Sequence, residues 1–249
     1  MAAYSIADSI LVDDANCVGL WTFDDVYTDS SGNGNTLTPS GTPSFATGKF
    51  NNGLDLELSS SQYAAIADAS QTGLDITGDW SFSLWAKIEQ LPSTAGTNFT
   101  LGSKYLSTGN QRSYRAFIGS DDKLNIQYSG DGTNLTQLIT TAAFVVAGDV
   151  GTFRHFALAV DVSAKTAIAY KDNVSKAFDA AVGTQTSVHS GTSDFNIGRG
   201  NSAAPDYMDG VIDDFGLFDR LLTSTEIGKI YDGTIDRRSL GGAFLLNMI

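Results

Sequence analysis

Several segments of the chain alternate apolar and polar residues with a period of two, the pattern of a half-buried β-strand. In Trp80–Ile88 every second side chain from Trp80 onward is apolar, while Trp85 falls on the opposite face. Arg154–Asp161 repeats the pattern, and 165–171 fits a hairpin partner across a short turn. Further strands are expected at 62–67, 114–119, 123–128, 136–140, 195–199 and 210–218. Glycine-rich and aspartate-rich turns separate these segments.

A single helix is expected near the end of the chain, over 222–233. Thr223 can cap its first turn, and Glu226 follows three residues later, as a capping box requires. Gly233 can end the helix. The apolar stripe consists of Ile227, Ile230 and Tyr231.

The chain contains no linker-like stretch and no repeat, so its 249 residues are expected to form one domain. A chain of many strands closes most easily as a β-sandwich. We place the core at about 18–233, with an N-terminal arm at 1–17 and an apolar tail at 234–249. Two interpretations of the tail stay open: it packs on this domain, or it docks on another subunit or particle.

The acidic composition limits the classes of binding partner that the chain can have. The formal net charge is −13, which argues against nucleic acid or an anionic membrane surface and is compatible with divalent cations and neutral sugars. Only three of the 28 acidic residues are glutamate, and aspartate favours turns. Cys17 is the only cysteine, so an intramolecular disulfide is excluded. No apolar run is long enough to span a membrane, and the N-terminus lacks the pattern of a signal peptide, so we expect synthesis in the cytoplasm.

Four segments, taken in order, resemble the laminin-G-like, concanavalin A-like lectin/glucanase domains. They are the opening 19–35, the strand at 80–85, the strand Arg154–Asp161, and the closing segment from 208 to the helix. Asp214 stands where the family pattern has glutamate, and Arg154 where it has tryptophan. The resemblance covers about 18–233 and implies an all-β jelly-roll sandwich of two antiparallel sheets, with its first and last strands near one another. It also implies mostly non-catalytic work such as sugar binding, adhesion or spacing.

The opening loop at 24–35 is dense in carboxylate, amide and main-chain oxygens, the ligands that calcium prefers. It lacks nitrogen and sulfur ligands, which disfavours zinc, and it is not an EF-hand. The resemblance implies a structural calcium that joins this loop to the closing strand. The ligands carried over are Asp24, Asp29, Asn35 and Asp213. The alternative is a hydrogen-bonded turn in which Asp29 accepts from the main chain.

A sugar site needs aromatic platforms beside amides and charged groups. Candidates lie in or beside expected loops at 104–115, 128–134 and 199–207. They are Tyr105, Arg112, Tyr114, Tyr128, Asn134 and Tyr207. The alternative for each aromatic is packing between strands. Trp21, Trp80 and Trp85 lie in strand patterns and are assigned to the core.

No catalytic residue is expected. The three glutamates are far apart in the sequence, and related glucanases carry two close together on one strand. Asp213 and Asp214 are adjacent, so they should point to opposite faces of a strand. Asp209 and Asp213 share a face and remain the one conceivable acid–base pair. His155 lies inside a strand pattern, where a buried structural histidine is expected.

The sequence therefore predicts a non-catalytic carbohydrate-binding or surface-binding module. With its single domain it resembles stand-alone domains of phage and bacterial origin, so a virion decoration or tail-associated adhesion protein is one expectation. Its partners would be a glycan, capsid or tail proteins, or further copies of itself. The alternatives are a self-assembling scaffold without a sugar site and a glycan-cleaving enzyme.

Overall fold

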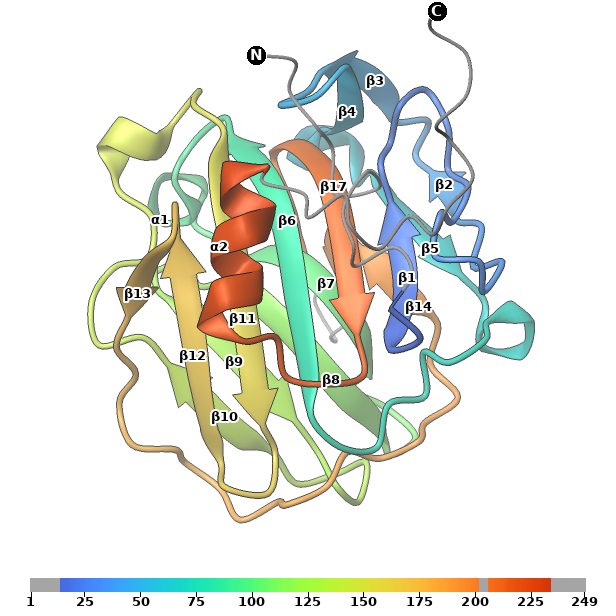
Figure 1. Cartoon of the computed structure of the whole chain (residues 1–249), viewed down its shortest axis with the longest axis vertical. Helices are drawn as coiled ribbons and strands as arrows, with labels where there is room; N and C mark the ends of the chain where they lie inside the picture. The colour runs from blue at the N-terminus through green and yellow to red at the C-terminus, as the bar shows by residue number, and fades with distance from the viewer. Residues whose placement is uncertain (1–13, 202–205, 234–249) are drawn as a thin grey trace, which may run out of the picture.

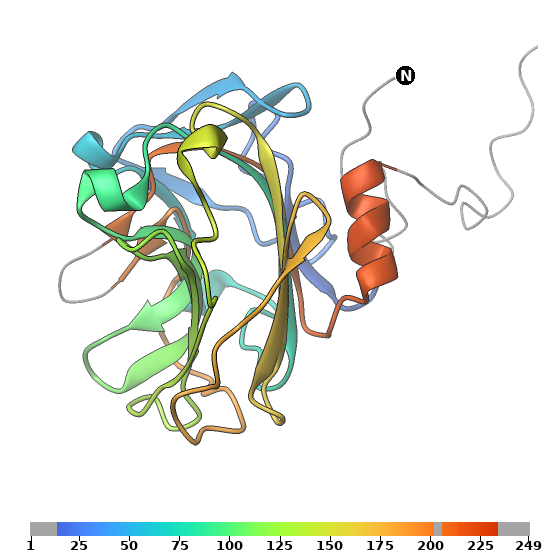
Figure 2. The ribbon, with the colours of Figure 1, turned by 90° about the vertical axis from the view of Figure 1, so that its left-hand side faces the viewer.

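The computed structural model describes residues 14–201 and 206–233, which form two antiparallel β-sheets packed face to face (Figures 1 and 2). Figure 2 shows the sheets as two layers, with helix α2 (Ser224–Asp232) outside one of them. The expected all-β sandwich with a short C-terminal helix is confirmed. The expectations for the first thirteen residues of the arm and for the tail at 234–249 lie outside the described residues.

The first sheet has eight strands in the order β13-β12-β11-β6-β17-β4-β3, and β1 pairs with β17 beside that path. They are β1 (Cys17–Trp21), β3 (Ser44–Thr47), β4 (Asn52–Leu56), β6 (Trp80–Ile88), β11 (Arg154–Asp161), β12 (Thr166–Lys171), β13 (Val174–Lys176) and β17 (Gly210–Phe218). The pairing of β1 with β17, in which Leu20 lies opposite Gly216, brings the first and last strands together as expected.

The second sheet has seven strands in the order β10-β9-β8-β7-β14-β5-β2. They are β2 (Thr38–Ser40), β5 (Tyr63–Ile66), β7 (Phe99–Leu106), β8 (Gln111–Ile118), β9 (Leu124–Tyr128), β10 (Thr136–Ile139) and β14 (Phe195–Ile197). A small ribbon of β15 (Arg199–Gly200) and β16 (Asp206–Tyr207) contacts β7. The short helices are α1 (Pro92–Ala95), η2 (Leu58–Ser60), η3 (Asp68–Ser70) and η4 (Ala147–Asp149).

The segment 104–115, expected as a loop, is instead a hairpin of two central strands, β7 and β8. Lys104 is a charged residue, but it is fully buried within β7. Its ammonium lies 2.5 Å from a carboxylate oxygen of Asp68 and 3.1 Å from one of Asp75. A buried charge is tolerated when it is paired and hydrogen-bonded, so tertiary partners allow a lysine inside the sheet.

Aromatic side chains from both sheets fill the space between them. Trp21 stacks on Phe195 with ring centroids 5.6 Å apart, and Phe82 lies 5.0 Å from Phe215. Trp80 packs 5.3 Å from Tyr114. Large buried aromatics dominate core energetics, so this cluster fixes how the sheets sit against each other.

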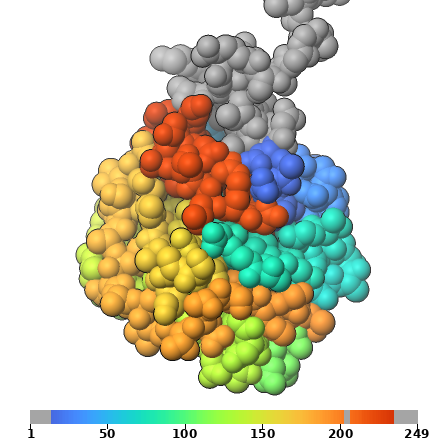
Figure 3. Space-filling view, turned by 60° about the horizontal axis from the view of Figure 1, so that its bottom comes forward, coloured from blue at the N-terminus to red at the C-terminus, as the bar shows by residue number. Residues whose placement is uncertain are grey.

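Helix α2 covers the outer face of the eight-stranded sheet. The predicted capping box is present: Thr223 Oγ1 accepts from the Glu226 main-chain nitrogen, and Glu226 accepts in return from that of Thr223. The helix ends at Gly233, whose φ of 61° suits a residue without a side chain. Trp85 is buried under this helix, stacked 5.8 Å from Tyr231, rather than between the sheets. Figure 3 shows the red surface of α2 beside the blue surface of the first described residues.

Among the described residues, no helix combines the length and apolar character needed to cross a membrane. Strand β11 carries a buried histidine, His155, as expected. Its Nε2 lies 2.9 Å from Ser83 Oγ, and its ring packs against Trp85 and Tyr231. Burial and the nearby charge of Lys49 lower the pKa of His155 to about 3.

Candidate functional site

The opening loop divides into two parts with different roles. Asp29 accepts hydrogen bonds from the main-chain nitrogens of Leu20, Ser31 and Asn35 at 2.8–2.9 Å and from the Ser31 hydroxyl at 2.8 Å. These four donors occupy both carboxylate oxygens. For Asp29 the geometry favours the hydrogen-bonded turn over ligation of a metal.

Asn35 is likewise engaged in holding the chain together. Its amide nitrogen donates to the carbonyls of Val18 and Thr72, and its side-chain oxygen accepts from the Thr72 nitrogen, all at 2.8 Å. The side chain is fully buried. Satisfied buried amides of this kind fix a unique arrangement of loops, so Asn35 acts as a clamp between the opening loop and the segment before β6.

The other two predicted calcium ligands, Asp24 and Asp213, meet the same loop, 48–52. Asp24 accepts from the main-chain nitrogen of Asn52 and from the side chain of Asn51, each at 3.2 Å. Asp213 accepts from the main-chain nitrogen of Phe50 at 2.9 Å. A Cβ added at Gly48 would lie 2.6 Å from Asp213 Oδ2, so only glycine lets the loop approach this closely.

Asp213 is fully buried, and its Oδ1 has no hydrogen-bond partner among the described residues. Burial and the charge of Asp24 raise its pKa to about 7. Three non-glycine residues around it, Phe23, Asn51 and Asp214, have φ values of 57°, 40° and 48°. Such backbone strain clusters at functional sites. A buried carboxylate with an open oxygen, beside a second carboxylate, is an oxygen-only donor set that fits a hard divalent cation.

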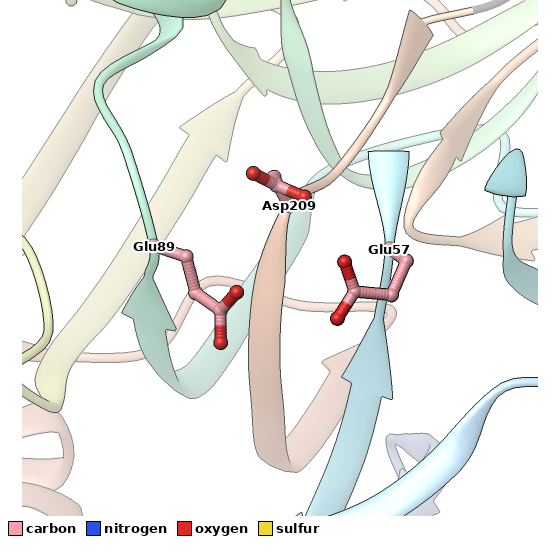
Figure 4. Close-up of side chains that lie close together, drawn as sticks. All are labelled: Glu57, Glu89 and Asp209. Atoms are coloured by element: carbon pink, nitrogen blue, oxygen red, sulfur yellow. The ribbon is translucent and has the colours of Figure 1, made fainter. Parts of the chain in front are cut away.

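A second acidic cluster was missed by the sequence analysis. Glu57 follows β4, Glu89 follows β6 and Asp209 precedes β17, so three neighbouring strands bring them to one edge of the sheet. One oxygen from each residue lies within 4.8 Å of the others, which makes the triad a possible metal-binding group. Figure 4 shows Glu57 and Glu89 reaching toward the start of β17 from both sides. Their separation along the sequence concealed this proximity.

The three carboxylates of the triad differ in their surroundings. Asp209 is buried and accepts from the Leu58 nitrogen at 3.0 Å and from the Gln90 side chain at 2.6 Å. Glu89 is exposed, and partial desolvation together with neighbouring carboxylates raises its pKa. Asp209 and Asp213, considered above as an acid–base pair, therefore belong to different clusters.

Two of the predicted sugar-binding residues are wrong. Tyr114 and Tyr128 are fully buried between the sheets, and their hydroxyls donate to the carbonyls of Leu74 and Val162 at 2.9 and 3.1 Å. Both lie at ends of the strands expected at 114–119 and 123–128, and their side chains point inward, as the alternative of packing between strands had it. They serve the core and cannot contact a ligand.

Of the remaining four predicted residues, Tyr105 is also buried, while Arg112, Asn134 and Tyr207 are at least partly exposed. Tyr105 lies against the guanidinium of Arg115, 4.2 Å from its ring centroid. Arg112 donates to the carbonyls of Thr133 and Ser107, and Asn134 caps its own turn by donating to Asp131 at 2.7 Å. Tyr207 packs 6.2 Å from Tyr63, an aromatic that the sequence analysis did not select.

Comparison with known proteins gives a family and several similar folds. The family described as the concanavalin A-like lectin/glucanases superfamily matches residues 58–228. No curated protein sequence gives a significant match. Domain 4 of an extracellular arabinanase from Geobacillus stearothermophilus, solved in complex with arabinotriose, is 20% identical, with a TM-score of 0.65. That alignment covers 87% of this chain and 98% of the arabinanase domain.

Botulinum neurotoxin domains are also similar in fold. The receptor-binding domain of the mosaic serotype C/D is 15% identical with a TM-score of 0.66, over 92% of this chain and 52% of that chain. A structure of botulinum neurotoxin type C, a toxin whose cell entry depends upon interaction with two ganglioside molecules, is 12% identical with a TM-score of 0.64. That alignment covers 89% of this chain and 52% of the neurotoxin chain. The chain thus spans about half the length of these neurotoxin domains. At these identities the likeness establishes the fold, while the family match over more than half of the sequence establishes that the chain belongs to the concanavalin A-like lectin/glucanase superfamily.

Proposed function

We propose that this protein is a non-catalytic module that binds carbohydrate or a glycan-bearing surface. The observation that carries the proposal is the family membership over residues 58–228. It is supported by the similar folds of an arabinanase domain in complex with arabinotriose and of neurotoxin receptor-binding domains. The superfamily also includes glucanases, so the fold alone does not decide between binding and cleavage.

The surface chemistry supports binding of a glycan. The outer face of the seven-stranded sheet carries aromatic rings beside guanidinium groups: Arg199 lies 4.6 Å above the Tyr63 ring, and Tyr207 adjoins Tyr63. Aromatic faces pack on sugar rings, and planar polar groups pair with hydroxyls. Tyr63, Tyr207 and Arg199 are each partly exposed, so they can contact a ligand.

We further propose that a divalent cation, calcium by its donor chemistry, is held by Asp24 and Asp213. When bound, it would neutralise the two carboxylates and tie loop 48–52 to β17. The unpaired oxygen of Asp213 and the strained backbone around it support this assignment. The cation would act on the fold, since neither carboxylate lies among the aromatic residues of the sheet's outer face.

The glycan proposal is tested by retention of the full chain on a panel of immobilised polysaccharides, with calcium and with a chelator. Retention on at least one polysaccharide, lost on changing Tyr63 or Tyr207 to alanine, is the expected result. Light scattering on the same samples reports oligomeric state. A stable assembly that is retained on no polysaccharide would instead favour the scaffold alternative. Docking on capsid or tail proteins stays a prediction.

A glycan-cleaving activity is the second candidate, favoured by the triad of Glu57, Glu89 and Asp209. Carboxyl groups of retaining glycosidases are separated by about 5 Å, similar to the spacing here. The raised pKa of Glu89 would suit a general acid. Reducing-end release from the same polysaccharides, lost in Glu89→Gln, would establish cleavage; its absence across the panel would eliminate it.

A further inference from the structure

Lys104 occupies a core position in the middle of the seven-stranded sheet. It lies in β7 opposite Tyr114 of β8 and Phe195 of β14, and residues directly opposite on paired strands point to the same face. Tyr114 and Phe195 are core residues, so the Lys104 side chain also points between the sheets, and none of it is exposed. An apolar side chain of similar size would fill this position without the cost of burying a charge.

Two carboxyl groups meet the amine at the end of this buried side chain. Lys104 Nζ lies 2.5 Å from Asp68 Oδ1 and 3.1 Å from Asp75 Oδ1. It also donates to the carbonyl of Ser193 at 2.8 Å. The three N–H groups of the ammonium thus have three separate acceptors. These contacts fix the position of the nitrogen relative to both carboxyl groups.

Each carboxyl group is held in place by a further contact. The main-chain nitrogen of Asp68, the first residue of η3, donates to Asp194 Oδ1 at 3.2 Å. Asp75 Oδ2 accepts from the side chain of Gln71 at 2.9 Å, while its Oδ1 contacts Lys104. The side chains of Asp68 and Asp75 are 24% and 39% exposed. Water and protons can therefore leave the site although the amine is buried.

The distance between the amine and Asp68 suits the formation of an amide bond. A carbonyl oxygen is about 1.2 Å from its carbon. The nitrogen therefore lies roughly 3–4 Å from Asp68 Cγ, close to the separation at which oriented groups react. A neutral amide is also less costly to bury than an ammonium and a carboxylate. The second carboxylate, Asp75, can accept and donate the protons that the reaction moves.

We propose that Lys104 and Asp68 condense to an isopeptide bond, with Asp75 as the group that transfers protons. Asp75 takes a proton from Nζ, and the nitrogen lone pair forms a bond to Asp68 Cγ. The bond from Cγ to one carboxyl oxygen breaks, and that oxygen leaves as water with two protons from Nζ, both passed on by Asp75. The third N–H still donates to Ser193. One ammonium and one carboxylate thus give one amide and one water, without an oxidant or a reductant.

The isopeptide bond would be a covalent cross-link in a chain whose single cysteine excludes an intramolecular disulfide. It joins η3 to β7 across a separation of 36 residues. A cross-link over such a loop lowers the entropy of the unfolded chain and so stabilises the fold. The cross-link does not depend on glycan binding, and either can be present without the other.

The pair formed by Lys171 and Asp149 is a control within the same chain. Its nitrogen–oxygen distance is 2.6 Å, and the Asp149 side chain is only 4% exposed. Among the described residues, Asp149 is the one ion-pair partner of Lys171, and the other ion-pair partner of Asp149 is the guanidinium of Arg154. A guanidinium stays protonated and cannot take up a further proton. This pair should therefore remain an ion pair.

The test is the intact mass of the full chain after unfolding. Wild type should be lighter than its sequence by one water, about 18 Da. Lys104→Met, Asp68→Ala and Asp75→Asn should each have the full mass of their sequences. Asp75→Asn is the sharpest of the three, because both reacting groups remain. Lys171→Met removes the amine of the control pair and should keep the deficit of one water.

Fragmentation of proteolytic peptides then locates the lost water. Peptides joined through Lys104 and Asp68 support the cross-link. A wild type of full mass overturns it and leaves an ion pair, and an equal deficit in all four variants overturns it as well. A deficit that mild alkali reverses belongs to a succinimide at an aspartate–glycine sequence such as Asp131–Gly132, which also overturns the proposal. The wild-type mass and peptide map decide the question even where a variant fails to fold.

Discussion

Two buried titratable groups in the eight-stranded sheet should have opposite effects on the free energy of unfolding as pH changes. His155 is buried under α2 and its pKa is lowered from 6.5 to about 3, chiefly by desolvation. Asp213 is buried beneath loop 48–52 and its pKa is raised from 3.8 to about 7, again chiefly by desolvation. Both groups therefore stay neutral in the folded protein over a range where they are charged in the unfolded chain.

The signs follow from proton linkage. Between pH 3 and 6.5 the unfolded state binds more protons at His155, so this residue makes stability rise with pH. Between pH 3.8 and 7 the folded state binds more protons at Asp213, so this residue makes stability fall with pH. Each slope is about 1.4 kcal/mol per pH unit, and the full penalties are on the order of 5 and 4 kcal/mol.

We expect the two slopes to cancel in the wild-type protein between pH 4 and 6.5. His155→Gln should lose stability relative to wild type by about 1.4 kcal/mol for each unit that pH rises, and Asp213→Asn should gain about as much. The double variant should run parallel to wild type. Urea unfolding at half-unit steps of pH, in a chelator that removes divalent cations, measures these differences.

His189→Gln is the matched control, because His189 is the only other histidine of the chain. This variant reports what the replacement of a histidine by glutamine does by itself to the free energy of unfolding. A flat difference for His155→Gln across pH 4 to 6.5 would show that this imidazole is not held neutral by burial. A flat difference for Asp213→Asn would refute the same reasoning for the carboxylate.

Three further predictions concern the loops and the core. Calcium in hundredfold excess over Kd should stabilise wild type by about 2.7 kcal/mol, a rise of roughly 5–10 °C in the melting midpoint. Asp24→Asn should abolish this rise. If Glu89→Gln abolishes the rise instead, the ion binds at the acidic triad. Asp29→Ala should cost about 2–3 kcal/mol by chemical denaturation with or without calcium, because it unpairs four donors; an effect seen only with calcium would make Asp29 a ligand. Tyr114→Phe should cost about 1 kcal/mol while glycan retention stays unchanged; lost retention without lost stability would contradict its place in the core.

The predicted elements that survived are those with strong local signals. Trp80–Ile88, Arg154–Asp161 and Gly210–Phe218 are strands with the expected bounds, and α2 begins and ends at the residues chosen from the sequence. Period-two alternation and a capping box depend on neighbouring residues alone, so they can be recognised without the fold. The hairpin at Lys104 could not be recognised from neighbouring residues, because its buried lysine depends on Asp68 and Asp75, which come from another part of the chain.

The sequence by itself determined the class of fold, the helix and the residues rich in oxygen ligands. Tertiary structure alone decided which of those residues meet. It separated Asp29 and Asn35, whose polar atoms hold the opening loop, from Asp24 and Asp213, which share loop 48–52. It also aligned Asn196, Arg115 and Gln127 in one row from three distant strands. The physical reason is register: alternation tells which face of a strand a side chain occupies, but only the pairing between strands tells which side chain lies beside it.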